Sequence, residues 1–142
     1  MSDDDRREIG HRLRQEVLGE DHVRRSLDGA SDFGRPMQEL ATEYCWGEVW
    51  SRPGLTRRER SLLNLAMLTA LNRSHELAVH VRGAVRNGCT VEEIQEALLQ
   101  AAVYCGIPAG MEAFRIAEGV LGEEVRDLRQ TANGDGSSEA AR

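Results

Sequence analysis

The sequence has few of the residues that fill a large hydrophobic core. Its 142 residues include only two each of Trp, Tyr and Phe, and aromatic residues make up 4% of the chain. A chain of this length forms a single domain. With so few large apolar side chains, a monomer would bury a modest core and leave many helix faces half-covered. We therefore expect the protein to associate with further copies of itself.

Cysteine is also scarce, and the three that are present are spread widely along the chain. An odd and widely spaced set excludes a disulfide framework. Cys45, Cys89 and Cys105 lie among apolar neighbours, which predicts buried and reduced thiols.

Long apolar runs are absent, since none approaches the roughly 20 residues that span a bilayer. The N-terminus opens with Asp at positions 3 to 5, where a signal peptide would carry positive charge, so we expect a cytoplasmic protein. Eighteen basic and twenty-four acidic residues give a net charge of −6. This charge opposes non-specific attraction to nucleic acid or to an anionic membrane surface. An anionic substrate would need local arginines instead.

The hydrophobic spacing predicts an all-α domain, because no segment alternates apolar and polar residues long enough to form a sheet. Capping boxes at Thr56 to Glu59 and at Thr90 to Glu93 mark two helix starts, and Ser74 is expected to cap another. A short turn should surround Val23 and Leu27, and longer helices are expected at about 5–18, 36–46 or 36–50, 57–71, 74–87, 91–104 and 108–121.

Glycine and proline supply the expected helix boundaries, at Gly19, Pro53-Gly54, Asn87-Gly88 and Gly122. Residues 1–130 should then form one helical domain of about six to seven helices. The tail, residues 131–142, offers too little apolar surface to offset the entropy of ordering, so we expect it to be disordered.

The segment from Arg73 to Pro108 carries the clearest signal of a functional site. At about 100° of rotation per residue, Arg73, Glu76, His80 and Asn87 fall on one stripe of a helix. Glu76 stands one turn before His80, where its carboxylate can orient the imidazole and raise its basicity. Two alternatives stay open: His80 at the edge of the core, bonded to a carbonyl, and Glu76 as an ordinary ion-pair partner of Arg73.

The pair His75 and His80 is not expected to bind zinc. The zinc-protease helix needs two histidines four residues apart, whereas these are five apart and diverge by about 140° around the helix axis. We therefore expect no metal site, and His75 should be exposed.

Arg60 and Asn64 lie one turn apart on another helix and could hold a carboxylate by charge-assisted hydrogen bonds. The alternative is an ion pair from Arg60 to Glu43 or Glu48. Glu43 is itself a candidate to face the site. So is Tyr104, whose hydroxyl could reach a ligand from a helix end or could lie at the surface.

The segment from Trp46 to Trp50 provides large and rigid apolar side chains. Such side chains more often make subunit contacts or pack in a core than bind a substrate. The sequence leaves both of these roles open.

Four pieces of the chain resemble the gamma-carboxymuconolactone decarboxylase family in their order and spacing. They are residues 42–55, 57–68, 76–80 and 104–109, within a likeness that extends from about Gly10 to Leu121. The resemblance implies an alkylhydroperoxidase D-like helical fold and a hexamer. The peroxidase relatives carry Cys-x-x-Cys a few residues before the histidine, and the matching positions here are Arg73 and Glu76. Thiol peroxidase chemistry needs two neighbouring sulfurs and is therefore excluded.

The resemblance implies cofactor-free decarboxylation of 4-carboxymuconolactone to 3-oxoadipate enol-lactone in protocatechuate catabolism. His80 would be the general acid or oxyanion donor, Glu76 would orient it, and Arg73 and Arg60 would anchor carboxylate or oxyanion, with neither role assigned to a particular arginine. Asn64, Glu43 and Tyr104 would complete the binding site. Two alternatives remain: a decarboxylase, cyclase or isomerase acting on another lactone or polyketide-like acid, and a non-catalytic helical oligomer that binds a ligand.

Overall fold

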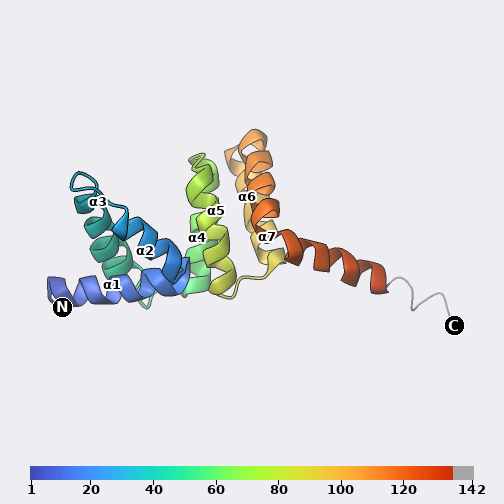
Figure 1. Ribbon diagram of the computed structural model, residues 1–142. Coiled ribbons are helices and arrows are strands. Elements are labelled where there is room, and N and C mark those ends of the chain that lie inside the picture. The colour runs from blue at the N-terminus through green and yellow to red at the C-terminus, as the bar shows by residue number, and fades with distance from the viewer. Residues whose placement is uncertain (136–142) are drawn as a thin grey trace.

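The computed structural model describes residues 1–135, and over that range the chain is helical without strands (Figure 1). The prediction of an all-α fold is confirmed. In chain order the elements are α1 (Asp3–Leu18), α2 (Glu20–Asp28), α3 (Arg35–Leu40), the π-helix η1 (Ala41–Val49), α4 (Arg57–Ala70), α5 (Ser74–Arg86), α6 (Val91–Cys105) and α7 (Ile107–Asp135).

Local capping chemistry starts α4 and α6 where the sequence predicts. The backbone N–H of Glu59 donates to the Thr56 hydroxyl at 3.1 Å, and Thr90 caps α6 in the same way. The prediction that Ser74 caps α5 is wrong. Ser74 is the first helical residue, Arg73 holds the cap position without a side-chain hydrogen bond, and the Ser74 hydroxyl instead donates to Glu112 at 3.4 Å.

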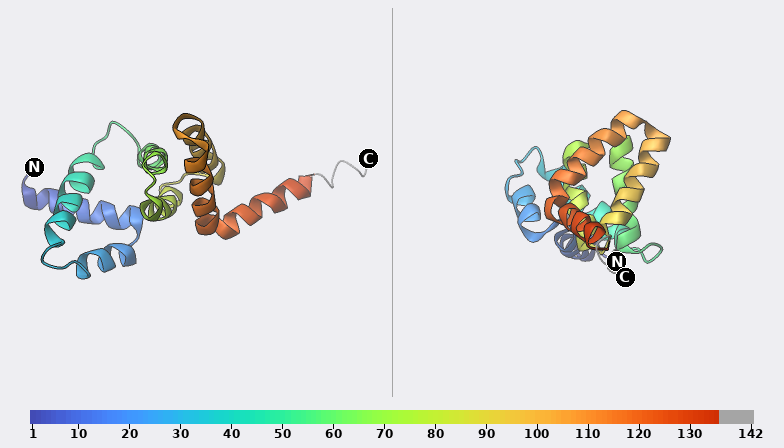
Figure 2. Two further views of the ribbon diagram at one scale, coloured as in Figure 1. Left: turned by 90° about the horizontal axis from the view of Figure 1, so that it is seen from above. Right: turned by 90° about the vertical axis from the view of Figure 1, so that its right-hand side faces the viewer.

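The predicted helix boundaries coincide with unusual backbone angles. Gly19 and Gly88 have φ values of 93° and 87°, in the left-handed region that favours glycine. At Gly122, φ is 14° and ψ is −77°, so the expected end of the last helix is a kink and α7 continues beyond it (Figure 2). Of the predicted disordered tail, residues 131–135 form the end of α7 and residues 136–142 lie outside the described range.

The predicted helix that begins near Pro36 divides into two parts. The chain starts as α3 and changes at Ala41 into the wider π-helix η1, which ends at Val49. Trp46 and Trp50 of this region stack with ring centroids 4.5 Å apart and are buried. They therefore pack in the core, which decides between the two roles that the sequence left open for them.

Two groups of apolar side chains form the core. One lies among α4, α5, α6 and α7 and includes Leu65, Leu77 and Leu98. The other joins α1, α2 and η1, where Val17 and Val23 pack with the tryptophans. Figure 2 shows the N-terminal helices as one group beside α4 and α5, with α6 and α7 on the far side.

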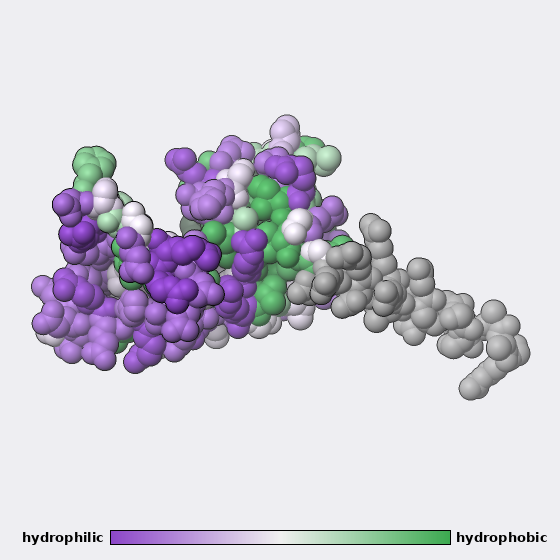
Figure 3. All heavy atoms as spheres, viewed as in Figure 1, coloured by the Kyte–Doolittle hydropathy of each residue, from purple (hydrophilic) through white to green (hydrophobic). Residues whose placement is uncertain are grey.

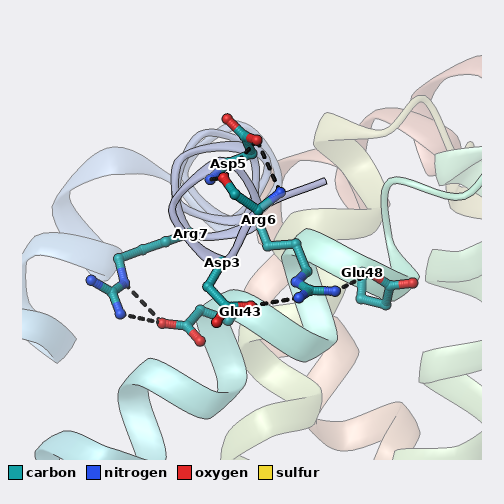
Figure 4. A network of polar contacts seen from close by, with 7 residues as sticks. Asp3, Asp5, Arg6, Arg7, Glu43 and Glu48 are labelled. Carbon is teal, nitrogen blue, oxygen red and sulfur yellow. Dashed lines mark hydrogen bonds and ion pairs between the residues drawn. The ribbon is translucent and has the colours of Figure 1, made fainter.

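Two close backbone contacts hold α1 against η1. A Cβ atom added at Gly10 would lie 1.9 Å from the carbonyl oxygen of Thr42, and one added at Gly47 would lie 2.3 Å from that of Arg6. Only glycine permits so close an approach. Ion pairs reinforce the contact, from Arg7 to Glu43 at 2.6 Å and from Arg6 to Glu48 at 3.5 Å (Figure 4).

The cysteines differ from the prediction in two of three positions. Cys89 is buried as expected, but Cys45 and Cys105 are exposed, because η1 and the end of α6 turn them outward. Within the described residues, no helix is long and apolar enough to cross a membrane.

Candidate functional site

The site centres on His80, which α5 places against η1 and α4. Its ring lies parallel to that of Trp46, with centroids 6.3 Å apart and an interplanar angle of 3°. The Asn64 amide nitrogen lies 3.4 Å from His80 Nδ1. With the Asn64 amide oriented in this way its nitrogen donates, Nδ1 is the acceptor, and the tautomer that fits the contact carries its proton on Nε2.

The surroundings of His80 favour a neutral imidazole. Burial, together with the nearby charge of His22, lowers the pKa of His80 to about 4, although the charge of Glu76 acts in the opposite direction. At neutral pH the ring is therefore uncharged and presents one N–H donor. A neutral imidazole of this kind can donate a hydrogen bond to an oxygen on which negative charge develops.

The other residues of the predicted stripe have different surroundings. Glu76 and Arg73 are exposed. Within residues 1–135, no hydrogen bond joins Glu76 to His80 and no ion pair joins Glu76 to Arg73, so Asn64 is the ring's hydrogen-bond partner. Asn87 donates to the Ser61 hydroxyl at 2.8 Å and thereby ties the end of α5 to α4.

Arg60 lies on α4 one turn before Asn64 and is half-buried. Its Nη2 donates to the carbonyl of Arg52 at 3.2 Å, and its buried Nε has no hydrogen-bond partner in the part of the chain that the structure describes. The alternative ion pairs from Arg60 are not formed, because Glu43 and Glu48 pair with arginines of α1. Arg60 thus keeps hydrogen-bonding capacity for an anion.

Glu43 and Tyr104 lie apart from this arrangement. Arg7 holds the Glu43 carboxylate through both Nε and Nη2, on the contact between α1 and η1 (Figure 4). Tyr104 is 83% exposed and lines a groove between α4 and α6. Neither side chain contacts His80 among the described hydrogen bonds and ring contacts.

The sequence did not point to two further charged or titratable side chains, Arg14 and His22. Arg14 of α1 is buried, and its Nη atoms donate to the Thr42 hydroxyl at 3.2 Å and to the Gln38 side chain at 2.8 Å. Burial, then the charge of Arg14, lowers the pKa of His22 on α2. The available signal was the spacing of Arg14 from Gly10 and Val17, which places it on the buried side of α1.

A cavity of about 540 Å³ opens beside His22, between α2 and α5. Arg25, Arg82 and Arg86 line it together with Val79, the residue before His80. Glu20 and Asp21 also line the cavity, so its charge is mixed. Figure 3 shows the molecular surface hollowed between the N-terminal helices and the central part of the molecule.

The available side chains limit the chemistry. All eighteen basic residues are arginine, so a Schiff base between a lysine and a substrate carbonyl cannot form. Among the described residues, no group of His, Cys, Asp and Glu is arranged to hold a metal ion. The site can bind anions through arginine and can donate a hydrogen bond from a neutral histidine.

These features define a class of protein: an all-helical domain with a neutral histidine held by an asparagine, arginines on neighbouring helices, and no Cys-x-x-Cys of the thiol peroxidase kind. Comparison with family models makes the assignment specific. The chain belongs to the carboxymuconolactone decarboxylase family, whose model matches residues 35–119. The family predicted from the sequence is confirmed.

Two relatives match more of the chain than this segment, and a third matches a shorter stretch. The 4-carboxymuconolactone decarboxylase of Acinetobacter baylyi is 46% identical over 121 residues, covering 85% of this chain and 90% of the relative. The nitrosuccinic acid decarboxylase npaB of Metarhizium robertsii is 47% identical over 116 residues, covering 82% and 81%. An uncharacterized 15.0 kDa protein of Paracoccus denitrificans is 34% identical over 84 residues, covering 58% and 63%.

Proposed function

We propose that the protein is a carboxy-lyase that converts 4-carboxymuconolactone to 3-oxoadipate enol-lactone and CO₂. Similarity over most of the chain to a decarboxylase named for this substrate supports the proposal. The structural observation that carries it is the neutral His80, held by Asn64 one helical turn from Arg60, whose buried Nε has no hydrogen-bond partner among the described residues.

The proposed reaction uses the substrate as its own electron sink. The bond from the ring carbon to the carboxylate breaks, CO₂ leaves, and the electron pair passes through the adjacent double bond into the lactone carbonyl. A proton then adds to the ring carbon next to that carbonyl, which gives the enol-lactone. The reaction therefore needs no metal, pyridoxal phosphate or thiamine to stabilise the carbanion.

His80 is assigned the hydrogen bond to the lactone oxygen as that oxygen becomes negative. Its Nε2–H is the free donor when Asn64 occupies Nδ1. As charge develops on the oxygen, the adjacent imidazole becomes a stronger base, and Glu76 adds to this effect. Arg60 and Arg73 are assigned to a substrate carboxylate or to the oxygen that becomes negative, with neither role fixed to a particular arginine, and Glu43 and Tyr104 have no role in this proposal.

A second substrate has specific support from the relative named as a nitrosuccinic acid decarboxylase. In nitrosuccinic acid the nitro group can accept the electron pair as the lactone carbonyl does, so the same neutral donor would serve. Purified protein should be offered both acids at equal concentration, with CO₂ release as the readout. Turnover of the lactone with a higher kcat/KM supports the main proposal. A higher kcat/KM for nitrosuccinic acid would make that acid the proposed substrate in place of the lactone. Inactivity toward both acids would reject both proposals.

We also propose that the functional form is a homo-oligomer, with the hexamer as the expected state. Leu63, Val103, Ile107 and Met111 are each at least 50% exposed, and Leu63 and Val103 line the apolar groove between α4 and α6. Figure 3 shows hydrophobic residues reaching the surface over the α5–α7 part of the molecule. Contiguous apolar surface of this kind is typical of subunit contacts. Light scattering tests this proposal, and a stable monomer at micromolar concentration contradicts it.

A cytoplasmic location for the protein remains a prediction from the sequence.

A further inference from the structure

Arg14 is a buried cation without a buried anion. Its side chain is 7% exposed, and both hydrogen-bond acceptors, Thr42 and Gln38, are uncharged. The Nε atom is buried and has no hydrogen-bond partner among the described residues. Arginine is seldom buried unless a carboxylate or similar group compensates its charge. Burial accordingly lowers the pKa of Arg14. The position is unfavourable in the free protein and would become favourable when an anion arrives.

The surrounding backbone prevents Arg14 from relaxing outward with ease. Gly10, one turn before it, touches the carbonyl of Thr42, so α1 and η1 are in direct contact there. The Thr42 hydroxyl donates to the carbonyl of Gln38 at 2.8 Å and accepts from Arg14. The guanidinium is therefore held in place before any ligand binds.

Arg14 is linked to His80 through two routes. Trp46 lies one turn after Thr42 on η1, and its ring is parallel to that of His80. Burial has the largest effect on the pKa of both histidines, and in addition the charge of Arg14 lowers the pKa of His22 and the charge of His22 lowers that of His80. An anion held at Arg14 would lie against α1 and η1, and η1 also carries the Trp46 ring that is parallel to His80, whereas Asn64 contacts His80 from α4.

The chemistry of the substrate supplies such an anion. In 4-carboxymuconolactone the carbon that loses CO₂ also carries a CH₂–COO⁻ arm, which the product keeps. Nitrosuccinic acid contains the same unit, two carboxylates on adjacent carbons. A cation on the leaving carboxylate would oppose formation of neutral CO₂, whereas a cation on the retained carboxylate only holds the substrate.

We propose that Arg14 binds the carboxylate that the substrate retains, and that the site thereby selects acids containing a succinate unit. The inference rests on the proposed decarboxylase function. It adds a substrate-binding residue from α1, a helix outside the segment that the family model matches. Bound carboxylate would compensate the buried charge of the guanidinium.

The test compares Arg14→Gln with Arg12→Gln, which removes an exposed charge from the same helix. In Arg14→Gln, KM for the lactone should rise roughly 30- to 1000-fold, the usual effect of removing one partner of a buried charge pair. Its kcat should change much less, because an anchor contributes uniform binding. Arg12→Gln should match the wild type. Arg14→Lys should give an intermediate KM, since it keeps the charge but loses the two-pronged geometry.

Succinate provides a readout that does not depend on turnover. It should raise the thermal midpoint of the wild type and of Arg12→Gln, but not that of Arg14→Gln. Without ligand, Arg14→Gln should unfold at the same or a higher temperature, because an uncompensated buried charge has been removed.

The outcomes separate this inference from the proposed function. If KM and succinate binding are both unchanged in Arg14→Gln, the inference is overturned and the proposed decarboxylase function stands. A lower thermal midpoint of Arg14→Gln with an unchanged KM has the same consequence, because it shows a purely structural role. Arg14-dependent succinate binding by a protein that leaves the lactone untouched supports the anchor and rejects the proposed function.

Discussion

The α4–α7 region and the N-terminal region of α1, α2 and η1 reach stability by different means. In α4–α7, leucine, valine and isoleucine fill the space between capped helices. In the N-terminal region, two glycines bring the backbones of α1 and η1 into contact, and a charged residue lies inside. Figure 3 reflects the contrast, with mainly hydrophilic surface over the N-terminal helices and more hydrophobic surface toward α5–α7.

The difference indicates a division of labour across the site. The α4–α7 region supplies His80 and Asn64, and these lie within the segment that defines the family. The N-terminal region supplies a buried cation and a second histidine, and burying that cation carries a desolvation cost that an apolar side chain would avoid. We interpret the first region as the carrier of the chemistry and the second as the carrier of substrate selection.

The largest expected effect comes from His80 itself. His80→Ala should lower kcat by roughly 10²–10⁴, in line with usual contributions of a single acid, base or oxyanion donor. His75→Ala, an exposed histidine near the start of the same helix, should be nearly silent. Steady-state kinetics on the lactone decides the matter. Turnover by His80→Ala at the wild-type rate would remove His80 from the mechanism.

The two regions should respond differently to substitutions in their packing. Leu98→Ala removes a buried side chain of α6 and should lower the free energy of unfolding by about 2–5 kcal/mol with little change in KM. Gly10→Ala forces a methyl group against the Thr42 carbonyl, so α1 must shift from η1. For Gly10→Ala we expect the free energy of unfolding to decrease by about 1–3 kcal/mol. Unlike Leu98→Ala, this variant should also have a raised KM.

Urea unfolding and steady-state kinetics measure the two quantities. Gly54→Ala is the matched control, because nothing lies within 4 Å of a Cβ atom added there. If Gly10→Ala and Leu98→Ala change stability and KM in the same proportion, the two regions do not have separate roles.

The low pKa of His80 predicts a particular dependence on pH. In the unfolded chain the imidazole titrates near its ordinary value of 6.5, whereas in the folded protein the pKa is about 4. Between these values the unfolded state binds the extra proton, so His80 lowers stability as pH falls through this range, by about 3 kcal/mol in total. Activity should likewise decline only as the pH approaches 4.

Carboxylates also titrate over this range, so the measurement is a difference between two proteins. The free energy of unfolding of the wild type minus that of His80→Gln should decrease as the pH falls from 6.5 to 4. Above pH 6.5 this difference should not change with pH. A difference that does not vary with pH would show that His80 is not buried as a neutral ring.

The smallest expected effect concerns metal and sulfur. Activity should survive EDTA and the replacement of all three cysteines by serine, since the proposed mechanism uses neither. Cys89→Ser should cost some stability because Cys89 is buried, whereas Cys45→Ser and Cys105→Ser change exposed positions. Thermal midpoints and kcat of the single variants separate the two effects, and lost turnover in a folded cysteine variant would count against the mechanism.

The features that the sequence alone determined are those that depend on near neighbours along the chain. The capping boxes at Thr56 and Thr90 each satisfy backbone donors within three residues, so their sequence pattern is sufficient to predict them. The all-α fold follows from helical spacing in the same way. The one-turn relation of Arg60 to Asn64 was also readable, because both stand on a single helix.

The tertiary structure decided every relation between groups far apart in the sequence. The sequence allowed Glu43 to face the site, but in the structure its carboxylate binds Arg7, 36 residues away. His80 is bonded to Asn64, which is 16 residues away in the sequence. From its neighbours in the sequence alone, Arg14 would be predicted to be a surface arginine next to the apolar face of α1. Only the approach of η1, 28 residues further on, buries it without an anion. Helix propensity acts over a few residues, whereas the burial of a charge depends on which distant helix packs over it.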